Sequence, residues 1–183
     1  MQRLIFLYFV VQSFLYVAQE SPFQLLLVPQ DFPELGGLQS YAYGQANGKI
    51  LLIGGRLDGL HRRQPFASFD VAGNNNQLIV FDPMSHQKWS TSLSVLSQEL
   101  QEQLSSTNME FHQSGDYLYV VGGYGYDNAS AARMTFPYLT AIHVPQLIDA
   151  ILNNDLEEIK KELLEGNLRF VITVSKQYQN QGL

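Results

Sequence analysis

The chain contains no cysteine among its 183 residues. This absence excludes disulfide bonds, catalysis by a thiolate, metal sites built on cysteine and the anchoring of a lipoprotein. A chain without disulfide bonds or cysteine-bound metals depends on its hydrophobic core for stability, and 45% of its residues are hydrophobic. Basic residues are also scarce, since 11 Lys and Arg stand against 17 Asp and Glu, giving a net charge of −6. Nucleic acids and anionic membranes are bound through clustered Lys and Arg, so we expect neither as a partner.

The sequence also lacks a recognisable catalytic set. Its histidines are well separated, at His61, His86, His112 and His143. No zinc-protease, nucleophile-elbow or phosphate-loop motif is present. We therefore expect no catalytic residue, no bound metal, no cofactor and no enzymatic activity of the chain itself.

What the sequence does contain is a repeat. Tyr41–Gly55 reads YAYGQANGKILLIGG, and Met109–Gly123 reads MEFHQSGDYLYVVGG. The two stretches align without a gap at an offset of 68 (123 − 55). A fixed period of this kind predicts an architecture made of repeated structural units.

Each unit has the chemistry of a β-hairpin. Asn47-Gly48 and Gly115-Asp116 occupy equivalent positions and favour a two-residue turn with positive φ. We expect antiparallel pairing of Tyr41–Gln45 with Lys49–Gly55, and of Met109–Gln113 with Tyr117–Gly123. The glycine pair that ends each hairpin allows a sharp turn or close packing.

Further strands are predicted after each hairpin. Gln77–Asp82 and Tyr138–His143 are apolar runs that end at or just before a proline. In the first unit an outer strand begins near Trp89, whereas in the second unit Pro145–Leu152 is typical of a short helix. Asn154–Gly166 predicts another helix, with Asn154 or Asp155 as its cap.

Together these residues resemble the kelch repeat over Leu38–Ser90 and Thr107–Leu152. Kelch repeats form β-propeller blades of four antiparallel strands. The period is longer than the roughly 50 residues usual for the family, and the second unit lacks the tryptophan. Long blades with helical inserts are similar to those of secreted bacterial kelch-repeat proteins.

The resemblance implies an all-β fold, an incomplete kelch-type β-propeller of about two blades with short helical inserts and a C-terminal helix. Propellers have about four to eight blades, and 183 residues at this period hold about two and a half (183/68). We therefore expect an N-terminal fragment, with the remaining blades in a longer chain. The expected divisions are a first blade over 22–106, a second over 107–153, and over 154–183 a helix with the start of a third blade at Arg169–Val174. The alternative is a small, self-sufficient β domain with a helical tail.

The N-terminal segment resembles a secretory signal peptide, expected over residues 1–18. Arg3 precedes an apolar run that ends at the small residue Ala18, and this run is short for a membrane-spanning helix. The chain is therefore expected to be secreted, periplasmic or at the cell surface, with no integral membrane segment after processing. Alternatively, the segment is a buried first strand.

Candidate ligand-binding residues follow the two glycine pairs. After the first pair come Arg56, His61, Arg62 and Arg63, and after the second come Tyr124 and Tyr126. Arginine can hold a carboxylate, a phosphate or sugar hydroxyls, and tyrosine offers a stacking face. Both segments leave equivalent strands and should therefore lie on one rim. The more conservative interpretation is that Arg56 pairs with Asp58 within the loop and that the other charges are solvated.

Two functions fit these expectations. The first is an exported, non-catalytic propeller segment that binds a protein or glycan ligand on its rim. The second is a fragment of a secreted carbohydrate-active kelch enzyme resembling sialic-acid mutarotase, which would need an acid or base from a blade that this chain lacks.

Overall fold

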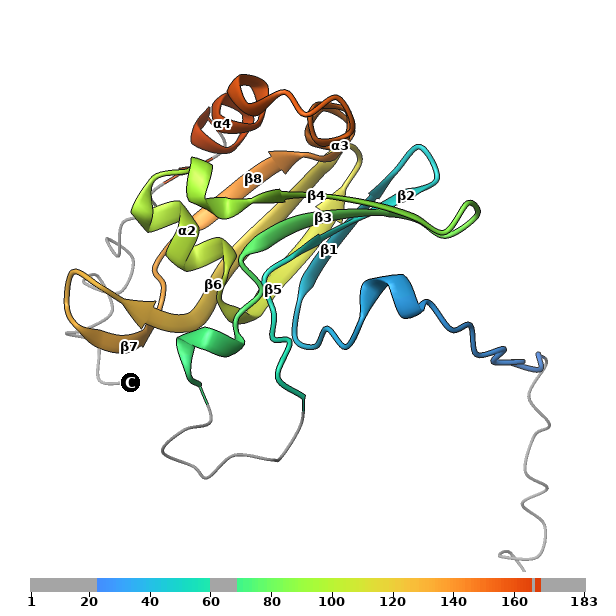
Figure 1. Cartoon of the computed structure of the whole chain (residues 1–183), viewed down its shortest axis with the longest axis horizontal. Coiled ribbons are helices and arrows are strands. Elements are labelled where there is room, and N and C mark those ends of the chain that lie inside the picture. Colours follow the sequence, from blue (N-terminus) through green and yellow to red (C-terminus); the bar gives the residue numbers. More distant parts are fainter. Residues whose placement is uncertain (1–22, 60–68, 166, 169–183) are drawn as a thin grey trace, which may run out of the picture. The chain divides into compact units, whose positions relative to one another are not determined.

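The computed structural model describes residues 23–59, 69–165 and 167–168 (Figure 1). The chain divides into two units, Met1–Asp31 and Phe32–Leu183. In the first unit, residues 24–31 have no regular secondary structure, and Phe23 and Leu25–Val28 are exposed. The predicted signal peptide over 1–18 lies outside the described residues. The second unit contains the strands and helices described below.

The first repeat forms a four-stranded antiparallel sheet. Its strands, in spatial order, are β1 (Ala42–Ala46), β2 (Lys49–Ile53), β3 (Gln77–Asp82) and β4 (Gln87–Ser92). The register joins Ala42 to Ile53 and Ala46 to Lys49. Asn47 and Gly48 both have positive φ, 51° and 73°, as a type I′ hairpin turn requires. The predicted hairpin, third strand and outer strand of this repeat are therefore confirmed.

The second repeat forms a five-stranded antiparallel sheet. Four of its strands lie in the spatial order β5 (Thr107–Ser114), β6 (Tyr117–Asp127), β8 (Leu139–His143) and β9 (Asn167–Leu168). The fifth strand, β7 (Ala132–Thr135), pairs with the C-terminal half of β6. Met109 opposes Gly122 and Gln113 opposes Leu118, which confirms the second predicted hairpin. Its turn differs from the first, because Gly115 has positive φ (58°) and Asp116 does not, the pattern of a type II′ turn.

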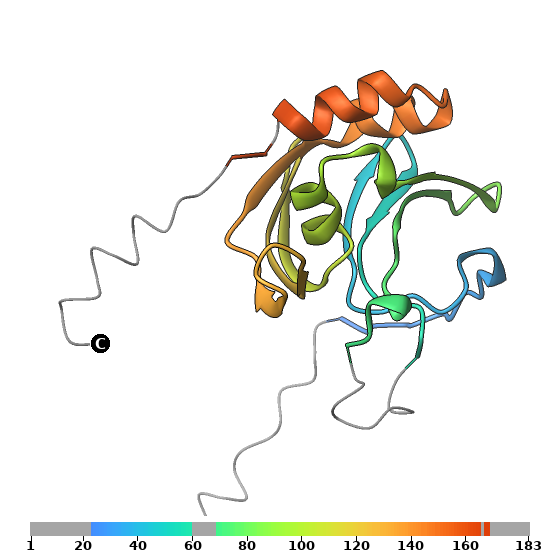
Figure 2. The ribbon, with the colours of Figure 1, turned by 60° about the vertical axis from the view of Figure 1, so that its left-hand side comes forward.

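Helices close one end of the two sheets. α3 (Val144–Leu152) and α4 (Leu156–Glu165) lie side by side at this end (Figures 1 and 2). Both were predicted from the sequence. A proline occupies the first turn of α3, where a missing N–H costs nothing. Asp155 caps α4, since its Oδ1 accepts a hydrogen bond from the Glu158 N–H at 3.1 Å.

The second sheet continues beyond residue 153, the predicted end of the second blade. Asn167 and Leu168 pair with Thr140 and Leu139, so the first strand residues after α4 form the outer edge of this sheet. α3 and α4 are thus inserted between its third and outer strands. Arg169–Val174, the predicted start of a third blade, lies outside the described residues.

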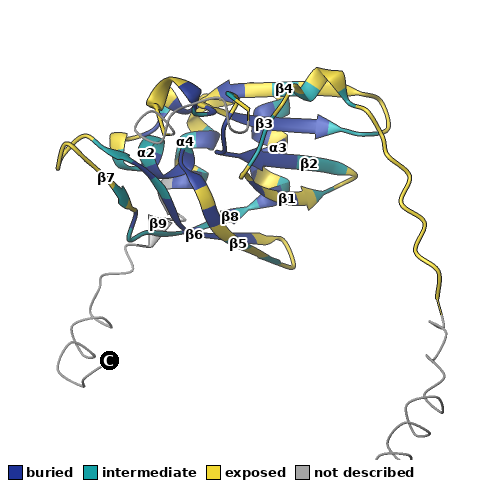
Figure 3. Cartoon of the chain, turned by 90° about the horizontal axis from the view of Figure 1, so that it is seen from below, coloured by how far each residue is buried: buried dark blue, intermediate teal, exposed yellow. Residues whose placement is uncertain are grey.

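The hydrophobic core lies between the two sheets. Leu51, Ile53 and Val80 of the first sheet and Leu118 and Val120 of the second belong to one buried cluster. Residues from α2 (Gln98–Leu104), α3 and α4 complete it, and Figure 3 shows buried residues concentrated in the central strands. The described part of the chain is therefore β-rich with a few helices. Its two sheets do not close into a ring, and the kelch-type propeller stays a prediction.

The glycine pairs place the two sheets against each other. Gly54 (φ 66°), Gly55 (φ 86°), Gly122 (φ 71°) and Gly123 (φ 96°) all have positive φ. The Gly55 N–H donates to the Ser106 carbonyl oxygen at 2.9 Å. A Cβ on Gly54 would stand 2.6 Å from that same oxygen, and a Cβ on Gly123 would overlap the Ser106 hydroxyl. Gly54 and Gly123 are therefore required because the chain between α2 and β5 passes directly against them.

Candidate functional site

The segments that follow the two glycine pairs meet at one end of the sheets, which we call the rim. The Phe69 ring lies edge-on to the Tyr124 ring at 5.0 Å. The Phe69 carbonyl oxygen accepts hydrogen bonds from Arg133 Nε at 3.3 Å and Nη2 at 3.1 Å. The two segments therefore share one rim, as their equivalent positions predict. This rim lies at the opposite end of the sheets from α3 and α4 (Figure 1).

Arg56 holds the first of these segments together. Its side chain is 7% exposed, with Nε 2.9 Å from Asp58 Oδ1 and Nη2 2.6 Å from Asp58 Oδ2. Nη1 donates to Asn74 Oδ1 at 2.9 Å, and Nη2 also donates to the Asp70 carbonyl oxygen at 3.0 Å. The Arg56 guanidinium is therefore buried and already bonded within the segment, and ligand binding by this residue stays a prediction. The expected pair of Arg56 with Asp58 within the loop is confirmed.

The other predicted site residues fall into two groups. His61, Arg62 and Arg63 lie outside the described residues. Tyr124 and Tyr126 lie in strand β6, opposite Thr135 and Arg133 of β7, rather than in a loop.

The β6–β7 hairpin was missed at the sequence level, although its turn carries a readable signal. Asp127, Asn128 and Ser130 are turn-forming residues, and Asp127 Oδ2 accepts a hydrogen bond from the Ser130 N–H at 2.8 Å. Hydrogen bonds from the Ser130 side chain and backbone lower the pKa of Asp127 below its usual value. The Asp127 carboxylate therefore stays ionised to a lower pH than an ordinary aspartate does.

A cavity of about 480 Å³ opens on the rim between the two repeats. We call it the rim pocket. Most of its lining side chains are amides and hydroxyls, supplied by the first repeat, by α2 and the residue after it, and by β6 and the turn that follows it: Val71, Asn74, Asn76, Ser92, Leu93, Ser94, Gln101, Glu102, Ser105, Tyr126 and Asn128. Tyr126 is the one predicted site residue that lines it. No described lining residue is basic.

Glu102 provides the single carboxylate among these lining residues. Its Oε1 accepts hydrogen bonds from Gln98 Nε2 at 2.9 Å, from Asn128 Nδ2 at 2.6 Å and from the Asn128 N–H at 3.3 Å. This acid is therefore engaged in fixing the β6–β7 turn against α2. Within the described chain, no hydrogen bond engages the side-chain amide of Asn76 or the hydroxyl of Tyr126.

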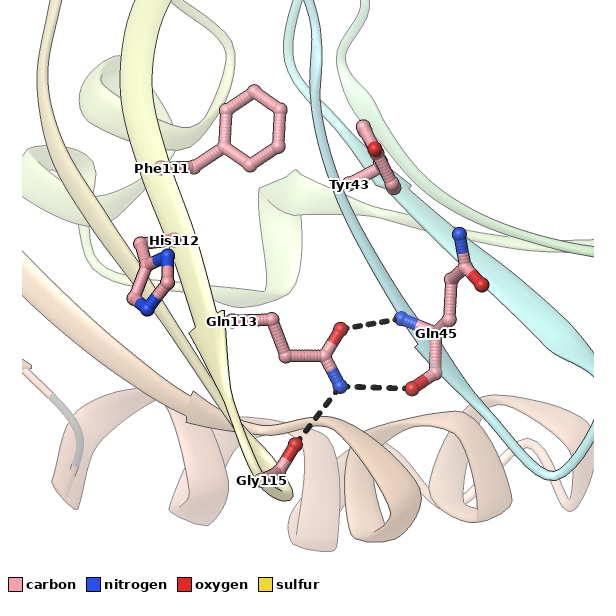
Figure 4. A pocket seen from close by; sticks show the side chains of 6 residues that line it. All are labelled: Tyr43, Gln45, Phe111, His112, Gln113 and Gly115. Atoms are coloured by element: carbon pink, nitrogen blue, oxygen red, sulfur yellow. Dashed lines mark hydrogen bonds between the residues drawn. The ribbon is translucent and has the colours of Figure 1, made fainter. Parts of the chain in front are cut away.

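A second cavity, of about 520 Å³, lies between the inner strands β1 and β5 (Figure 4). Tyr43 and Phe111 meet there edge to face, with ring centres 5.0 Å apart. The Gln113 amide is fully engaged: Oε1 accepts from the Gln45 N–H at 2.7 Å, and Nε2 donates to the carbonyl oxygens of Gln45 at 2.8 Å and Gly115 at 3.0 Å. The polar side chain at the centre of this cavity, Gln113, is therefore used to join the two sheets. The cavity offers fewer unbonded polar side chains to a ligand than the rim pocket does.

Among the residues that the structure describes, no group of three or more His, Asp or Glu side chains could hold a metal ion. No helix in that part of the chain is long and apolar enough to cross a membrane. In comparisons with known proteins, no family model matches the chain and no curated protein sequence matches it.

Proposed function

We propose that the chain is a kelch-type propeller segment that acts as a non-catalytic binding scaffold, with the rim pocket as a glycan-binding site. The observation that carries this proposal is the lining of the pocket. Its amides and hydroxyls come from both repeats and surround a cavity of about 480 Å³. A site at the junction of two units, with a few convergent polar groups, is a common form of ligand pocket.

The chemistry of the lining favours a neutral ligand rich in hydroxyl groups. Amides and hydroxyls both donate and accept hydrogen bonds, which matches the mixed requirement of sugar hydroxyls. Tyr126 adds a ring that combines an apolar face with a polar tip. An anionic ligand fits less well, because Arg56 is bonded within its own loop and the chain carries a net charge of −6.

The same lining favours binding over hydrolysis or isomerisation of a sugar. Acid–base catalysis needs titratable side chains within hydrogen-bonding reach of the reacting atoms, and glycoside hydrolysis typically uses two carboxyl groups. Among the described residues of the pocket, Glu102 is the single acid, and it accepts hydrogen bonds from Gln98 and Asn128. The enzyme-fragment alternative therefore has no supporting observation in this pocket.

Two features support the kelch-type assignment within this proposal. The two sheets repeat the same hairpin and glycine pair at an offset of 68 residues, and each hairpin pairs with a third strand, β3 in the first sheet and β8 in the second. Successive strands in the first sheet are spatial neighbours in the order β1-β2-β3-β4, as in a propeller blade. Export through the apolar N-terminal segment is part of the proposal, and so is a location in the periplasm, at the cell surface or outside the cell.

The test is a glycan array probed with the full chain and with two pocket variants. Asn76→Ala removes an amide that no described residue engages, and Tyr126→Phe removes one hydroxyl. Each should weaken binding to any glycan that the native protein retains, by roughly two- to tenfold per lost hydrogen bond. Gln87→Ala, on the exposed outer strand β4, is the matched control and should bind normally.

Melting temperatures of all four proteins separate lost binding from lost folding. The proposal is supported if both pocket variants keep their stability and bind less, while Gln87→Ala is unchanged. It is contradicted if the folded native chain retains no glycan, or if the retained glycan binds both pocket variants as well as it binds the native protein.

A further inference from the structure

The interface between the two sheets joins faces that are not equivalent in the repeat. The first sheet contributes Leu51 and Ile53, both 0% exposed. The second sheet contributes Leu118 and Val120, also 0% exposed. With the offset of 68 residues, Leu118 and Val120 correspond to Ile50 and Leu52, on the opposite face of β2 from Leu51 and Ile53. The packing is therefore head to tail.

The second sheet exposes the face that the first sheet buries. The counterparts of Leu51 and Ile53 are Tyr119 and Val121, which are 37% and 47% exposed. Tyr117 lies on the same side of β6 and is also exposed. We call these three residues the second-sheet outer face. The equivalent residues of the first sheet, Leu51 and Ile53, are fully covered by the second sheet.

The complementary face lies on the far side of the first sheet. Tyr43, Ile50 and Leu52 share that side of β1 and β2, and we call them the first-sheet outer face. Tyr43 is 41% exposed, whereas Leu52 is only 5% exposed. Phe32 covers the part of this side nearest β4, where its ring packs edge-on against Phe81 at 5.0 Å. A neighbour can therefore reach this face at Tyr43 and at the half-buried Ile50, but not at Leu52.

We propose that a second copy of this chain docks its first-sheet outer face onto the second-sheet outer face. The contact would repeat the head-to-tail sense of the interface already present between the two sheets, with Tyr43 and Ile50 of one copy meeting the second-sheet outer face of the other. Such heterologous contacts close into rings when the rotation per step permits. Closed propellers contain about four to eight sheets, and a ring of these two-sheet units would therefore contain about two to four copies.

The first measurement is the mass of the full chain in solution, by light scattering and sedimentation over a wide range of concentrations. The expected result is a discrete oligomer of about two to four copies. Val121→Lys places a charge on one outer face, and Tyr43→Lys places a charge on the other, so each variant alone should be monomeric. Met84→Lys, at a residue that is 88% exposed in the β3–β4 turn, is the control and should assemble like the native chain.

Mixing the two monomeric variants tests the head-to-tail arrangement itself. Val121→Lys keeps an intact first-sheet outer face, and Tyr43→Lys keeps an intact second-sheet outer face. The mixture should therefore form a 1:1 heterodimer that grows no further. If Tyr43→Lys unfolds through loss of its contact with Phe111, Ile50→Lys replaces it.

Three outcomes would overturn the proposal. One is a native chain that stays monomeric at every concentration, and another is folded variants that oligomerise like the native chain. The third is a mixture that contains only monomers. Because every protein compared carries the same residues 1–31, association through that segment would leave the variants indistinguishable from the native chain.

Discussion

Replacing Gly54 by Ala should destabilise the protein far more than the same change at Gly48. Both glycines have positive φ, 66° and 73°, so an alanine at either position has to adopt a left-handed conformation that costs about 1–2 kcal/mol. Their surroundings differ. A Cβ at Gly48 would meet nothing within 4 Å, whereas a Cβ at Gly54 would stand 2.6 Å from the Ser106 oxygen and 3.0 Å from the Leu104 oxygen.

These two oxygens belong to the backbone at the end of α2, so they cannot move aside as a side chain can. Forcing an extra carbon into a packed site typically costs about 1–3 kcal/mol more. We therefore expect Gly48→Ala to lower the unfolding free energy by about 1–2 kcal/mol and Gly54→Ala to lower it by about 2–5 kcal/mol. For a chain of this size, each kcal/mol corresponds to about 2–4 °C in melting temperature.

The assay is thermal and urea unfolding of the native chain and the two variants, followed by circular dichroism. Equal losses at the two positions would refute the reasoning, because φ strain alone would then account for the glycine pair. A larger loss at Gly48 would refute it as well. We expect a larger loss of unfolding free energy for Gly54→Ala than for Gly48→Ala. The urea slope should be unchanged if the unfolded state is unaffected.

Three further predictions follow from single contacts. Gln113→Glu should destabilise more than Gln113→Ala in urea unfolding, because a carboxylate cannot donate to the Gln45 carbonyl oxygen and would face it with like charge; equal losses would argue against the amide bridge. The pKa of Asp82 is lowered by hydrogen bonds from the backbone N–H groups of Met84 and Ser85, so its contribution to stability is present above a pH of about 4 and is lost as the pH falls through the folded-state pKa. Asp82→Asn should remove that part of the acid dependence in melts between about pH 2 and 7, and an unchanged acid slope would contradict the assignment. Arg56→Lys should lose nearly as much stability as Arg56→Ala, since lysine cannot bridge both oxygens of Asp58 and also reach Asn74; full retention in the lysine variant would show that charge alone suffices.

The sheets could be predicted from the sequence because their signals are local. Asn47-Gly48 and Gly115-Asp116 fix two hairpins through turn chemistry alone, and a gapless repeat around them confirms the pattern within the sequence itself. The helices α3 and α4 were equally readable, from Pro145 at a helix start and from Asp155 at a cap. In each of these cases the deciding residues lie within a few positions of the element they define.

The candidate site could not be predicted in the same way, because its parts are far apart in the sequence. Asn76 and Tyr126 are brought to one cavity by the packing of two sheets, and nothing in either segment alone indicates that neighbour. Arg56 shows how pairing within a loop competes with ligand binding. Several arginines on one loop suggested ligand binding. Asp58, two positions from Arg56, instead accepts hydrogen bonds from Nε and Nη2 of the Arg56 guanidinium. Local composition therefore drew attention to the basic loop and indicated Tyr126 alone among the residues that line the neutral pocket.

The location of the rim pocket links binding to the integrity of the interface between the sheets. Asn76 belongs to the first repeat and Tyr126 to the second, and both line one cavity. A ligand that contacts both should bind the packed sheets and not the unfolded chain. At a free concentration a hundred times its dissociation constant, such a ligand would stabilise the native chain by about 2.7 kcal/mol.

Gly54→Ala should then weaken binding as well as folding, although Gly54 does not line the pocket. Its Cβ would press on the end of α2, and α2 supplies Gln101 and Glu102 to the pocket. Gly48→Ala, at the far end of the first hairpin, should leave the affinity of the folded protein unchanged. The measurement is glycan affinity at a temperature where both variants are folded. Equal affinities would contradict the proposed coupling between α2 and the pocket.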